Sequence, residues 1–367
     1  MNIIYDYQIF SMQQYGGISR YYNELARNIN KSNDITILSP LYINNYLNNN
    51  NDVSVKGIKI NANKSLGYMS KIIFAFNRLI NPIITLKYKP EIIHKTYYYD
   101  HSKYSKNKTK KVITVHDMIN EIYPSKTKNY KTHLINKKRA CDEADHIFCN
   151  SENTRKDLIK IFDINPEKTT VTHLAFLSDF NLNKPKKIPN MRPFILFIGQ
   201  RDRYKNFKNL LKAYASNQEL NQYFDLVAFG GGKFTNSEIN LITELGLSKS
   251  NVFHKGGGDS VLRDLYKSAA LFVCPSEYEG FGIPVLEAMN YGCPVVCSNT
   301  SSLPEVGGDA AYLFDPKSVR SISAAINKVI YDEELKKQLV KKGYERIKKF
   351  SWDKCAKITL DTYKKLI

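Results

Sequence analysis

Residues 279–291 read EGFGIPVLEAMNY, and the interpretation of the whole chain begins from this stretch. Glu279 and Glu287 enclose two glycines, one proline and several large apolar residues. Gly280 and Gly282 lack a Cβ, so the backbone at these positions can approach a ligand closely. A carboxylate at each end of an otherwise apolar segment indicates a binding site rather than an ordinary surface loop.

The neighbouring residues predict a strand, a loop and a helix. The apolar run at 269–276 is typical of a buried strand. Pro284 suits the first turn of a helix and Gly292 suits its end, so we expect a helix between them. Glu279 then lies in the strand-to-helix loop, and Glu287 lies one turn inside the helix.

This arrangement predicts a nucleotide-sugar site. A glycine-rich loop before a helix presents backbone amides and the positive end of the helix dipole to anions such as phosphate. The two carboxylates suit hydrogen bonds from sugar hydroxyls. The alternative is an ordinary turn with Glu279 in solvent, although Glu287 in an apolar helix would still require a partner.

Apolar runs alternate with amphipathic stretches along the first half of the chain, which predicts a parallel α/β sheet with covered faces. Ser151 is a candidate N-cap for the second of the two predicted helices. The predicted strands cover residues 2–10, 34–40, 89–98, 110–117 and 145–151, and the helices cover residues 19–30 and 151–162.

A segment with three prolines, residues 182–193, interrupts this alternation and is typical of a linker. The pattern then resumes, with strands predicted at 194–200, 224–232, 251–256, 269–276 and 293–299 and a helix at 207–217. We therefore predict an α/β protein with two Rossmann-like, doubly wound parallel-sheet domains and a ligand cleft between them. The domains cover residues 1–185 and 186–350, and the helix at 351–367 is expected to pack back on the first.

The chain of 367 residues carries a formal net charge of +19. Residues 1–187 hold 29 Lys and Arg against 16 Asp and Glu, so the excess lies mainly in the first half. This charge indicates an anionic partner, or merely a lysine-rich composition. No apolar run is long enough to span a bilayer, and the first residues do not resemble a secretory leader. The six cysteines lack metal-type spacing, so we expect a reducing, cytoplasmic setting.

Several common catalytic and nucleotide-binding motifs are absent from the sequence. The sequence holds no G-x-G-x-x-G dinucleotide fingerprint and no phosphate-binding P-loop, which disfavours redox and ATP chemistry. It also holds no G-x-S-x-G nucleophile turn, which disfavours a hydrolase. No D-x-D-type metal motif is evident.

The opening stretch resembles the E-x7-E motif of retaining glycosyltransferases of family 4, which have the GT-B fold. Residues 275–316 resemble that family's signature region almost throughout, and the branch most similar comprises mannosyl- and rhamnosyltransferases of cell-surface polysaccharides. The resemblance continues, in order, through residues 16–26, 112–119, 149–160, 195–214 and 350–363.

The resemblance implies roles for both carboxylates. Glu287 would bind the ribose hydroxyls of the nucleotide, and Glu279 would lie at the donor sugar as a candidate catalytic residue. The intervening backbone amides would contact the sugar and the phosphates; they belong to Gly280, Phe281, Gly282 and Ile283.

The resemblance also implies cations for the diphosphate. Lys205 matches the family's lysine, whereas Gln200 occupies the position of the usual arginine. We expect Arg201 or Arg203 to replace it. Two fixed cations suit a leaving group that gains negative charge in the transition state.

In the first domain, the resemblance assigns the turn at Gly16 and Gly17 to the donor phosphate and sugar. His116 matches a histidine that faces the donor sugar, with Asp117 as a residue that could orient it. Without the resemblance, the glycines could form an ordinary turn and the histidine could be a structural hydrogen-bonding group.

The resemblance implies a retaining hexosyltransferase that needs neither metal nor cofactor. Its donor would be a GDP- or UDP-sugar, its acceptor a glycan or a lipid-linked sugar, and nucleic acid is not an expected partner. Residues 67–89 either lie on an anionic membrane as a peripheral contact or pack in the core with lysines reaching solvent. Two alternatives remain, a nucleotide-sugar epimerase on the same fold and a non-catalytic basic binding protein.

Overall fold

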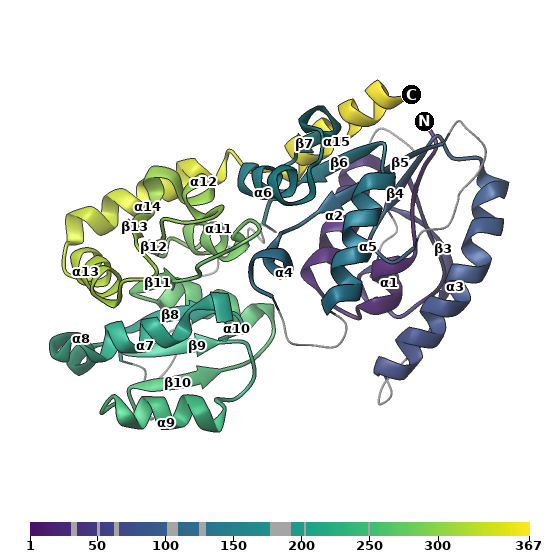
Figure 1. Ribbon diagram of the computed structural model, residues 1–367. Helices are drawn as coiled ribbons and strands as arrows, with labels where there is room; N and C mark the ends of the chain where they lie inside the picture. The colour runs from purple at the N-terminus through teal and green to yellow at the C-terminus, as the bar shows by residue number, and fades with distance from the viewer. Residues whose placement is uncertain are drawn as a thin grey trace. The chain divides into compact units, whose positions relative to one another are not determined.

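The computed structural model describes residues 1–30, 35–49, 52–61, 66–100, 109–124, 130–176, 192–201, 203–248 and 250–367. The chain forms two compact units (Figure 1). The first unit comprises Met1–Leu174 with Trp352–Ile367, and the second comprises Ala175–Ser351. The predicted boundary at residue 185 and most of the predicted linker lie outside the described residues.

The first unit is built on a parallel sheet of seven strands in the described residues, in the order β3-β2-β1-β4-β5-β6-β7. This is the order of a doubly wound sheet. The strands from β1 to β3 are added toward one edge, and β4 then begins the half on the other side of β1. The strands are β1 Ile3–Tyr5, β2 Ile35–Tyr42, β3 Ser54–Lys59, β4 Ile92–Lys95, β5 Lys110–Val115, β6 His146–Cys149 and β7 Thr169–Val171.

The C-terminal helix packs against α2 and belongs to the first unit, although it follows the second unit in sequence. Its Tyr363 is fully buried and hydrogen-bonds to His94 at the centre of the sheet. The helices of this unit are α1 Gln8–Met12, α2 Gly17–Asn30, α3 Leu66–Tyr88, α4 Ile119–Ile122, α5 Tyr130–Glu143, α6 Glu152–Phe162 and α15 Trp352–Leu366, with 3₁₀ turns η1 Tyr46–Asn49 and η2 Pro166–Lys168.

The single strand predicted for residues 2–10 is wrong beyond Tyr5. The buried carboxylate of Asp6 accepts hydrogen bonds from Thr96 N at 2.8 Å and from Gln8 Nε2 at 2.7 Å. These bonds turn the chain away from the sheet, and helix α1 begins at Gln8. Apolar side chains alone could not separate a strand from a short buried helix.

The helix predicted after Ser151 is confirmed. Ser151 has an extended backbone, and its hydroxyl accepts a hydrogen bond from Thr154 N at 3.0 Å, as an N-cap does. The helix predicted from Ser19 begins two residues earlier, so Gly17 is the first residue of α2.

The second unit has a parallel sheet of six strands in the described residues, in the order β10-β9-β8-β11-β12-β13. The predicted pair of doubly wound parallel-sheet domains is therefore confirmed. The strands are β8 Phe194–Ile198, β9 Asp225–Phe229, β10 Val252–Lys255, β11 Leu271–Cys274, β12 Val295–Ser298 and β13 Tyr312–Phe314.

Helices α7 and α13 pack on this sheet and share a core of fully buried residues, among them Leu210, Tyr214 and Ile326. The helices of the second unit are α7 Phe207–Ala215, α8 Gln218–Tyr223, α9 Asn236–Glu244, α10 Asp259–Ser268, α11 Ile283–Asn290, α12 Leu303–Gly307, α13 Val319–Ile330 and α14 Glu333–Ile347, with 3₁₀ turns η3 Arg203–Lys205 and η4 Gly308–Ala310.

In the second unit the strand order reverses between β8 and β11. Strands β9 and β10 lie on one side of β8, and β11, its parallel neighbour on the other side, begins the second half of the sheet. Ligands of doubly wound sheets bind beside the carboxyl ends of the strands at this point, because the two following loops diverge there. The loop after β8 leads to η3, and the loop after β11 leads to the N-terminus of α11. These two loops carry Lys205 and Glu279.

Candidate functional site

Lys205 and Glu279 form an ion pair at the switch point of the second unit. Lys205 Nζ lies 2.7 Å from Glu279 Oε1, and Ser276 Oγ donates to the same oxygen at 2.6 Å. The pair joins the loop after β8 to the loop after β11. The structure thus brings together two residues that the sequence analysis predicted at one site.

Both side chains are largely enclosed, with 17% of Lys205 and 12% of Glu279 exposed. Burial alone would lower the pKa of the Lys205 ammonium. The charge of Glu279 and the hydrogen bond to it outweigh burial and raise this pKa above its usual value. Lys205 is therefore a fixed positive charge throughout the neutral pH range.

Two serines that the sequence analysis missed hold the glycine-rich loop in place. Ser301 Oγ donates to Glu279 O at 2.6 Å and accepts from Glu279 N at 3.0 Å. Ser302 Oγ lies 2.9 Å from Glu279 O and 2.8 Å from Phe281 O. The run of hydroxyl residues at 300–302 was a signal for these contacts, but only the fold shows which carbonyls it reaches.

Gly282 is the N-cap of α11 and requires glycine. Its φ of +109° lies in the region that favours glycine, and a Cβ would meet Leu303 Cδ2 at 2.9 Å. The side chain of Phe281 is buried against Phe350, so its expected role is limited to its main chain. Since α11 starts at Ile283, the glycine-rich segment leads directly into the positive end of this helix.

Glu287 has the partner that a half-buried carboxylate requires. Tyr266 OH, from α10, donates to Glu287 Oε2 at 2.9 Å. Burial raises the pKa of Tyr266 well above its usual value, and the nearby charge of Glu287 raises it further. Tyr266 is therefore a neutral donor that orients the carboxylate, and the sequence analysis did not identify it.

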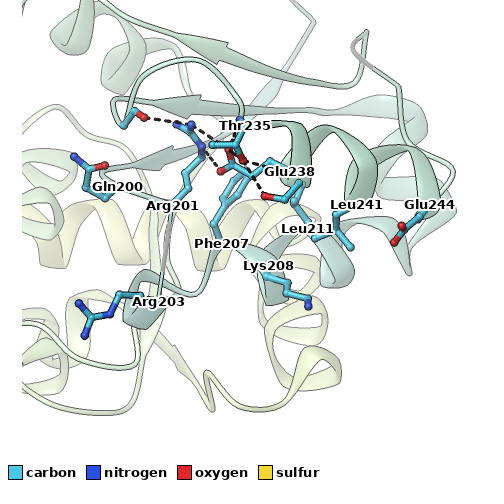
Figure 2. A pocket seen from close by; sticks show the side chains of 12 residues that line it. Gln200, Arg201, Arg203, Phe207, Lys208, Leu211, Thr235, Glu238, Leu241 and Glu244 are labelled. Carbon is cyan, nitrogen blue, oxygen red and sulfur yellow. Dashed lines mark hydrogen bonds and ion pairs between the residues drawn. The ribbon is translucent and has the colours of Figure 1, made fainter. Parts of the chain in front are cut away.

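The guanidinium of Arg201 makes its contacts with other residues of the second unit. Its guanidinium donates to Glu238 Oε1 at 2.7 Å, to Gly230 O at 2.6 Å and to Lys233 O at 3.0 Å. It also lies over the ring of Phe234, 4.9 Å from the centroid, and only 3% of its side chain is exposed. Figure 2 shows the contact between Arg201 and Glu238. Arg201 thus fastens the glycine turn after β9 to the start of α9.

Arg203 is exposed and, like Lys205, belongs to η3. In Figure 2 its side chain points away from the Arg201–Glu238 pair. Both arginines line a pocket of about 580 Å³, whose lining does not include Lys205 or Glu279. The other lining residues are Gln200, Phe207, Lys208, Leu211, Gly231, Thr235, Ser237, Glu238, Leu241 and Glu244.

In the first unit, His116 follows β5 and is almost fully buried. Its Nε2 has no hydrogen-bond partner among the described residues, and the ring of Tyr21 meets its ring edge-on at 4.9 Å. Burial lowers the pKa of His116 to about 4, so the imidazole is neutral near pH 7. Asp117, the expected orienting residue, accepts a hydrogen bond from Ile119 N at 3.0 Å.

Gly16 directly precedes α2, and Gly17 is the first residue of this helix. The carbonyl of Gly16 accepts from Arg20 N at 3.0 Å, and a Cβ at Gly16 would meet the side chain of Gln13. A Cβ at Gly17 would meet no atom within 4 Å, so this residue faces open space.

Within the described segments, no group of three or more His, Cys, Asp or Glu side chains is arranged to hold a metal ion. All six cysteines are buried and unpaired. No described helix combines the length and the apolarity needed to cross a bilayer.

Two family models cover most of the chain. The model described as "Glycosyltransferase Family 4" matches residues 15–175, and the model described as "Glycosyl transferases group 1" matches residues 179–346. A solved structure of Anabaena HepE in complex with UDP and glucose aligns with a TM-score of 0.73 at 16% identity, over 98% of both chains. This likeness shows the GT-B fold.

Curated relatives agree with the family models. The O-antigen chain mannosyltransferase B of Escherichia coli is 33% identical over 269 residues, which is 70% of each protein. The serotype-specific mannosyltransferase WbdA of the same organism is 30% identical over 65% of this chain, but the match spans only 31% of WbdA. Fold and site define a GT-B glycosyltransferase. The chain belongs to glycosyltransferase family 4, in the mannosyltransferase-like branch.

Proposed function

We propose that this protein moves a hexose from a nucleoside diphosphate sugar to a glycan or lipid-linked acceptor, with retention of the anomeric configuration and without a metal ion. The observation that carries the proposal is the arrangement of Lys205, Glu279 and Glu287 at the start of α11 and the carboxyl ends of β8 and β11. This edge of the second unit offers positive charge for phosphates and carboxylates for hydroxyls.

The diphosphate binds to the ammonium of Lys205 and to the amides that open α11. A helix N-terminus and a fixed cation both stabilise the charge that develops on a departing diphosphate, and they can do so without a metal. Arg203, exposed on the same 3₁₀ turn as Lys205, is our candidate for the second cation. Arg201 instead positions the glycine turn after β9, because its donors are turned toward Glu238 and backbone carbonyls.

The carboxylates bind the two sugars of the donor. Glu287, oriented by Tyr266, accepts hydrogen bonds from the ribose hydroxyls. Lys205 and Ser276 both contact Oε1 of Glu279, and we assign Oε2 of this residue to a hydroxyl of the transferred hexose. The serines at 301 and 302 hold the loop so that its amides face the ligand.

In the first unit, we assign the neutral Nε2 of His116 to a hydroxyl of the hexose. A buried nitrogen without a protein partner is costly unless a ligand or water satisfies it, and this supports the assignment. The turn at Gly16 and Gly17 remains a predicted donor contact.

The transferred hexose is mannose or a similar sugar, since the relatives include two proteins named as mannosyltransferases, one of the O-antigen chain and one serotype-specific. The HepE structure holds UDP and glucose, which supports a nucleoside diphosphate as the leaving group. We propose a GDP- or UDP-sugar as donor and a surface-polysaccharide precursor as acceptor.

A thermal-denaturation panel of GDP-, UDP- and dTDP-sugars tests the proposal. At about 100 times its dissociation constant, a true donor stabilises the folded state by roughly 2.7 kcal/mol. Transfer with EDTA present should equal transfer with Mg²⁺, and the product should keep the anomeric configuration of the donor. No stabilisation by any sugar nucleotide would refute the donor site. A rearranged sugar released without acceptor would indicate an epimerase.

A further inference from the structure

Helix α3 of the first unit is amphipathic with its apolar face outward. Six large apolar side chains of this helix are between 41% and 75% exposed. They are Tyr68, Ile72, Phe76, Leu79, Ile83 and Leu86. Their spacing of three or four residues places them on one face, within an arc of about 80°, since each helical residue advances about 100°. We call this row the α3 outer face.

The opposite side of α3 is buried although much of it is polar. Asn77 is fully buried, and its side chain donates to Leu41 O at 2.7 Å and to Ser11 Oγ at 2.8 Å. Asn81 and Thr85 follow it at four-residue intervals and are also buried. A surface helix normally directs its apolar stripe toward the core. In α3, by contrast, Asn77 and the buried Ile73 attach the inner side of the helix to the unit, and the apolar row is exposed. Figure 1 shows α3 at the outer edge of the first unit.

The charges beside the α3 outer face identify what covers it. Lys71 and Arg78 lie on one side of the row and Lys87 lies on the other, and all three are exposed. The sequence from 66 to 88 contains no Asp or Glu. An apolar stripe between cations, on a helix that does not span a bilayer, is the pattern of a helix lying in an anionic membrane surface.

A second copy of this chain is a poorer occupant. In a two-fold symmetric interface the same patch meets itself, so the cations of one helix would face those of its partner. No acidic residue of α3 could compensate them. An anionic lipid surface satisfies both the apolar row and the cations.

We infer that the α3 outer face lies in the headgroup region of a bilayer that contains anionic lipid. The apolar row extends about 27 Å along the helix, at about 1.5 Å per residue, and lies parallel to the membrane plane. The inference deepens the proposed function, because it supplies a lipid surface for a lipid-linked acceptor. It rests on α3 alone and is tested without donor.

The test is flotation of the full chain with vesicles of phosphatidylcholine alone and of phosphatidylcholine mixed with phosphatidylglycerol. We expect binding to the mixed vesicles, weakened at high salt. The double variant Leu79→Ser/Ile83→Ser should lower the partition coefficient at least tenfold, because two exposed apolar anchors are lost. The control Ile135→Ser/Ile161→Ser changes two exposed residues on α5 and α6 and should bind as the unaltered chain does.

A charge variant separates the two contributions. Lys71→Glu/Arg78→Glu should weaken binding to the mixed vesicles at least tenfold, whereas Lys156→Glu/Lys160→Glu on α6 should change it much less. Failure of the unaltered chain to bind mixed vesicles, or equal binding by α3 variants and controls, would overturn the inference. A dimer in sedimentation velocity that Leu79→Ser/Ile83→Ser converts to monomer, without vesicle binding, would assign the face to self-association. A chain that floats with vesicles but ignores every sugar nucleotide would refute only the donor site.

Discussion

Lys205 Nζ lies 2.7 Å from Glu279 Oε1, and the two residues belong to loops that leave adjacent parallel strands. The distance follows from the strand order, because β8 and β11 are neighbours in the sheet although Lys205 and Glu279 are 74 residues apart in sequence. The ion pair holds a positive charge at the edge of the sheet where doubly wound folds bind ligands.

Replacing Lys205 by methionine should weaken donor binding about tenfold to a hundredfold, since a hydrogen bond to a charged group contributes about 1.5–3 kcal/mol. The effect arises because the diphosphate loses its fixed cation. Isothermal titration with the sugar nucleotide selected by thermal denaturation measures it.

Lys208→Met is the matched control for that variant. Lys208 is an exposed lysine three residues further on, and it lines the separate pocket beside Arg201. Its replacement should leave the dissociation constant of the donor unchanged. Equal weakening by both variants would show that the general positive charge of the chain, and not Lys205, holds the donor.

Tyr266→Phe should weaken donor binding about threefold to tenfold, corresponding to one neutral hydrogen bond of about 0.5–1.5 kcal/mol. The reason is indirect, because Tyr266 orients Glu287 rather than contacting the ribose. Glu287→Ala should cause a larger loss, and the double variant should be no weaker than Glu287→Ala alone. Additive losses in this double-mutant cycle would contradict the assigned orientation of Glu287 by Tyr266.

The order of strands and helices was largely predictable, because buried strands and amphipathic helices leave different periodicities. The start of α11 was also predicted to within one residue, because Pro284 suits the first turn of a helix. The hydrogen-bonding partners of Glu279 and Glu287 could not be predicted from the sequence. Ser302 and Tyr266 each lie about twenty residues away in sequence, and only the strand order brings them to the loop.

Arg201 shows the limit of reasoning from sequence spacing. Its position after β8 suited a cation that binds phosphate, but its guanidinium donates a hydrogen bond to the carboxylate of Glu238, 37 residues further on. The end of β1 was missed for a similar reason, because the bonds of Asp6 to Thr96 span 90 residues. Polar contacts between distant segments leave no periodic signal in the sequence.

Gly17→Ala should leave the fold intact and lower the transfer rate at least tenfold. The added methyl group meets no protein atom within 4 Å, and alanine in a helix stabilises by at most about 1 kcal/mol over glycine. The loss of rate follows from our assignment of the space beside Gly17 to the donor. Initial rates and thermal unfolding of the same preparation measure both effects.

Gly67→Ala provides the comparison, since Gly67 also lies in the first turn of a helix and its Cβ would likewise meet no atom within 4 Å. It should unfold and transfer sugar as the unaltered chain does. Full activity of Gly17→Ala would remove Gly17 from the donor site.

His116 should make the stability of the first unit depend on pH. Burial lowers its pKa from 6.5 to about 4. Between these two pH values, therefore, His116 is protonated in the unfolded chain and neutral in the folded chain. The contribution of neutral His116 to the free energy of unfolding is fully present above about pH 6.5. It falls as the pH falls, and roughly 2 kcal/mol of it is lost near pH 5.

Urea unfolding of the unaltered chain and of His116→Gln, near neutral pH and near pH 5, measures this term. The difference in unfolding free energy between the two chains should change by roughly 2 kcal/mol between these conditions, in the transition of the unit that holds His116. Shifted pKa values that do not depend on His116, such as that of Asp6, are common to both chains and cancel. A difference that does not vary with pH would mean that His116 is not buried in its neutral form.

A crystal structure of the chain with the nucleoside diphosphate of its donor tests the central claim most directly. The account predicts the diphosphate within hydrogen-bonding distance of Lys205 Nζ and of the backbone amides that open α11, with the ribose hydroxyls on Glu287. An ordered nucleotide in the pocket beside Arg201 and Glu238, with its phosphates away from Lys205, would contradict it.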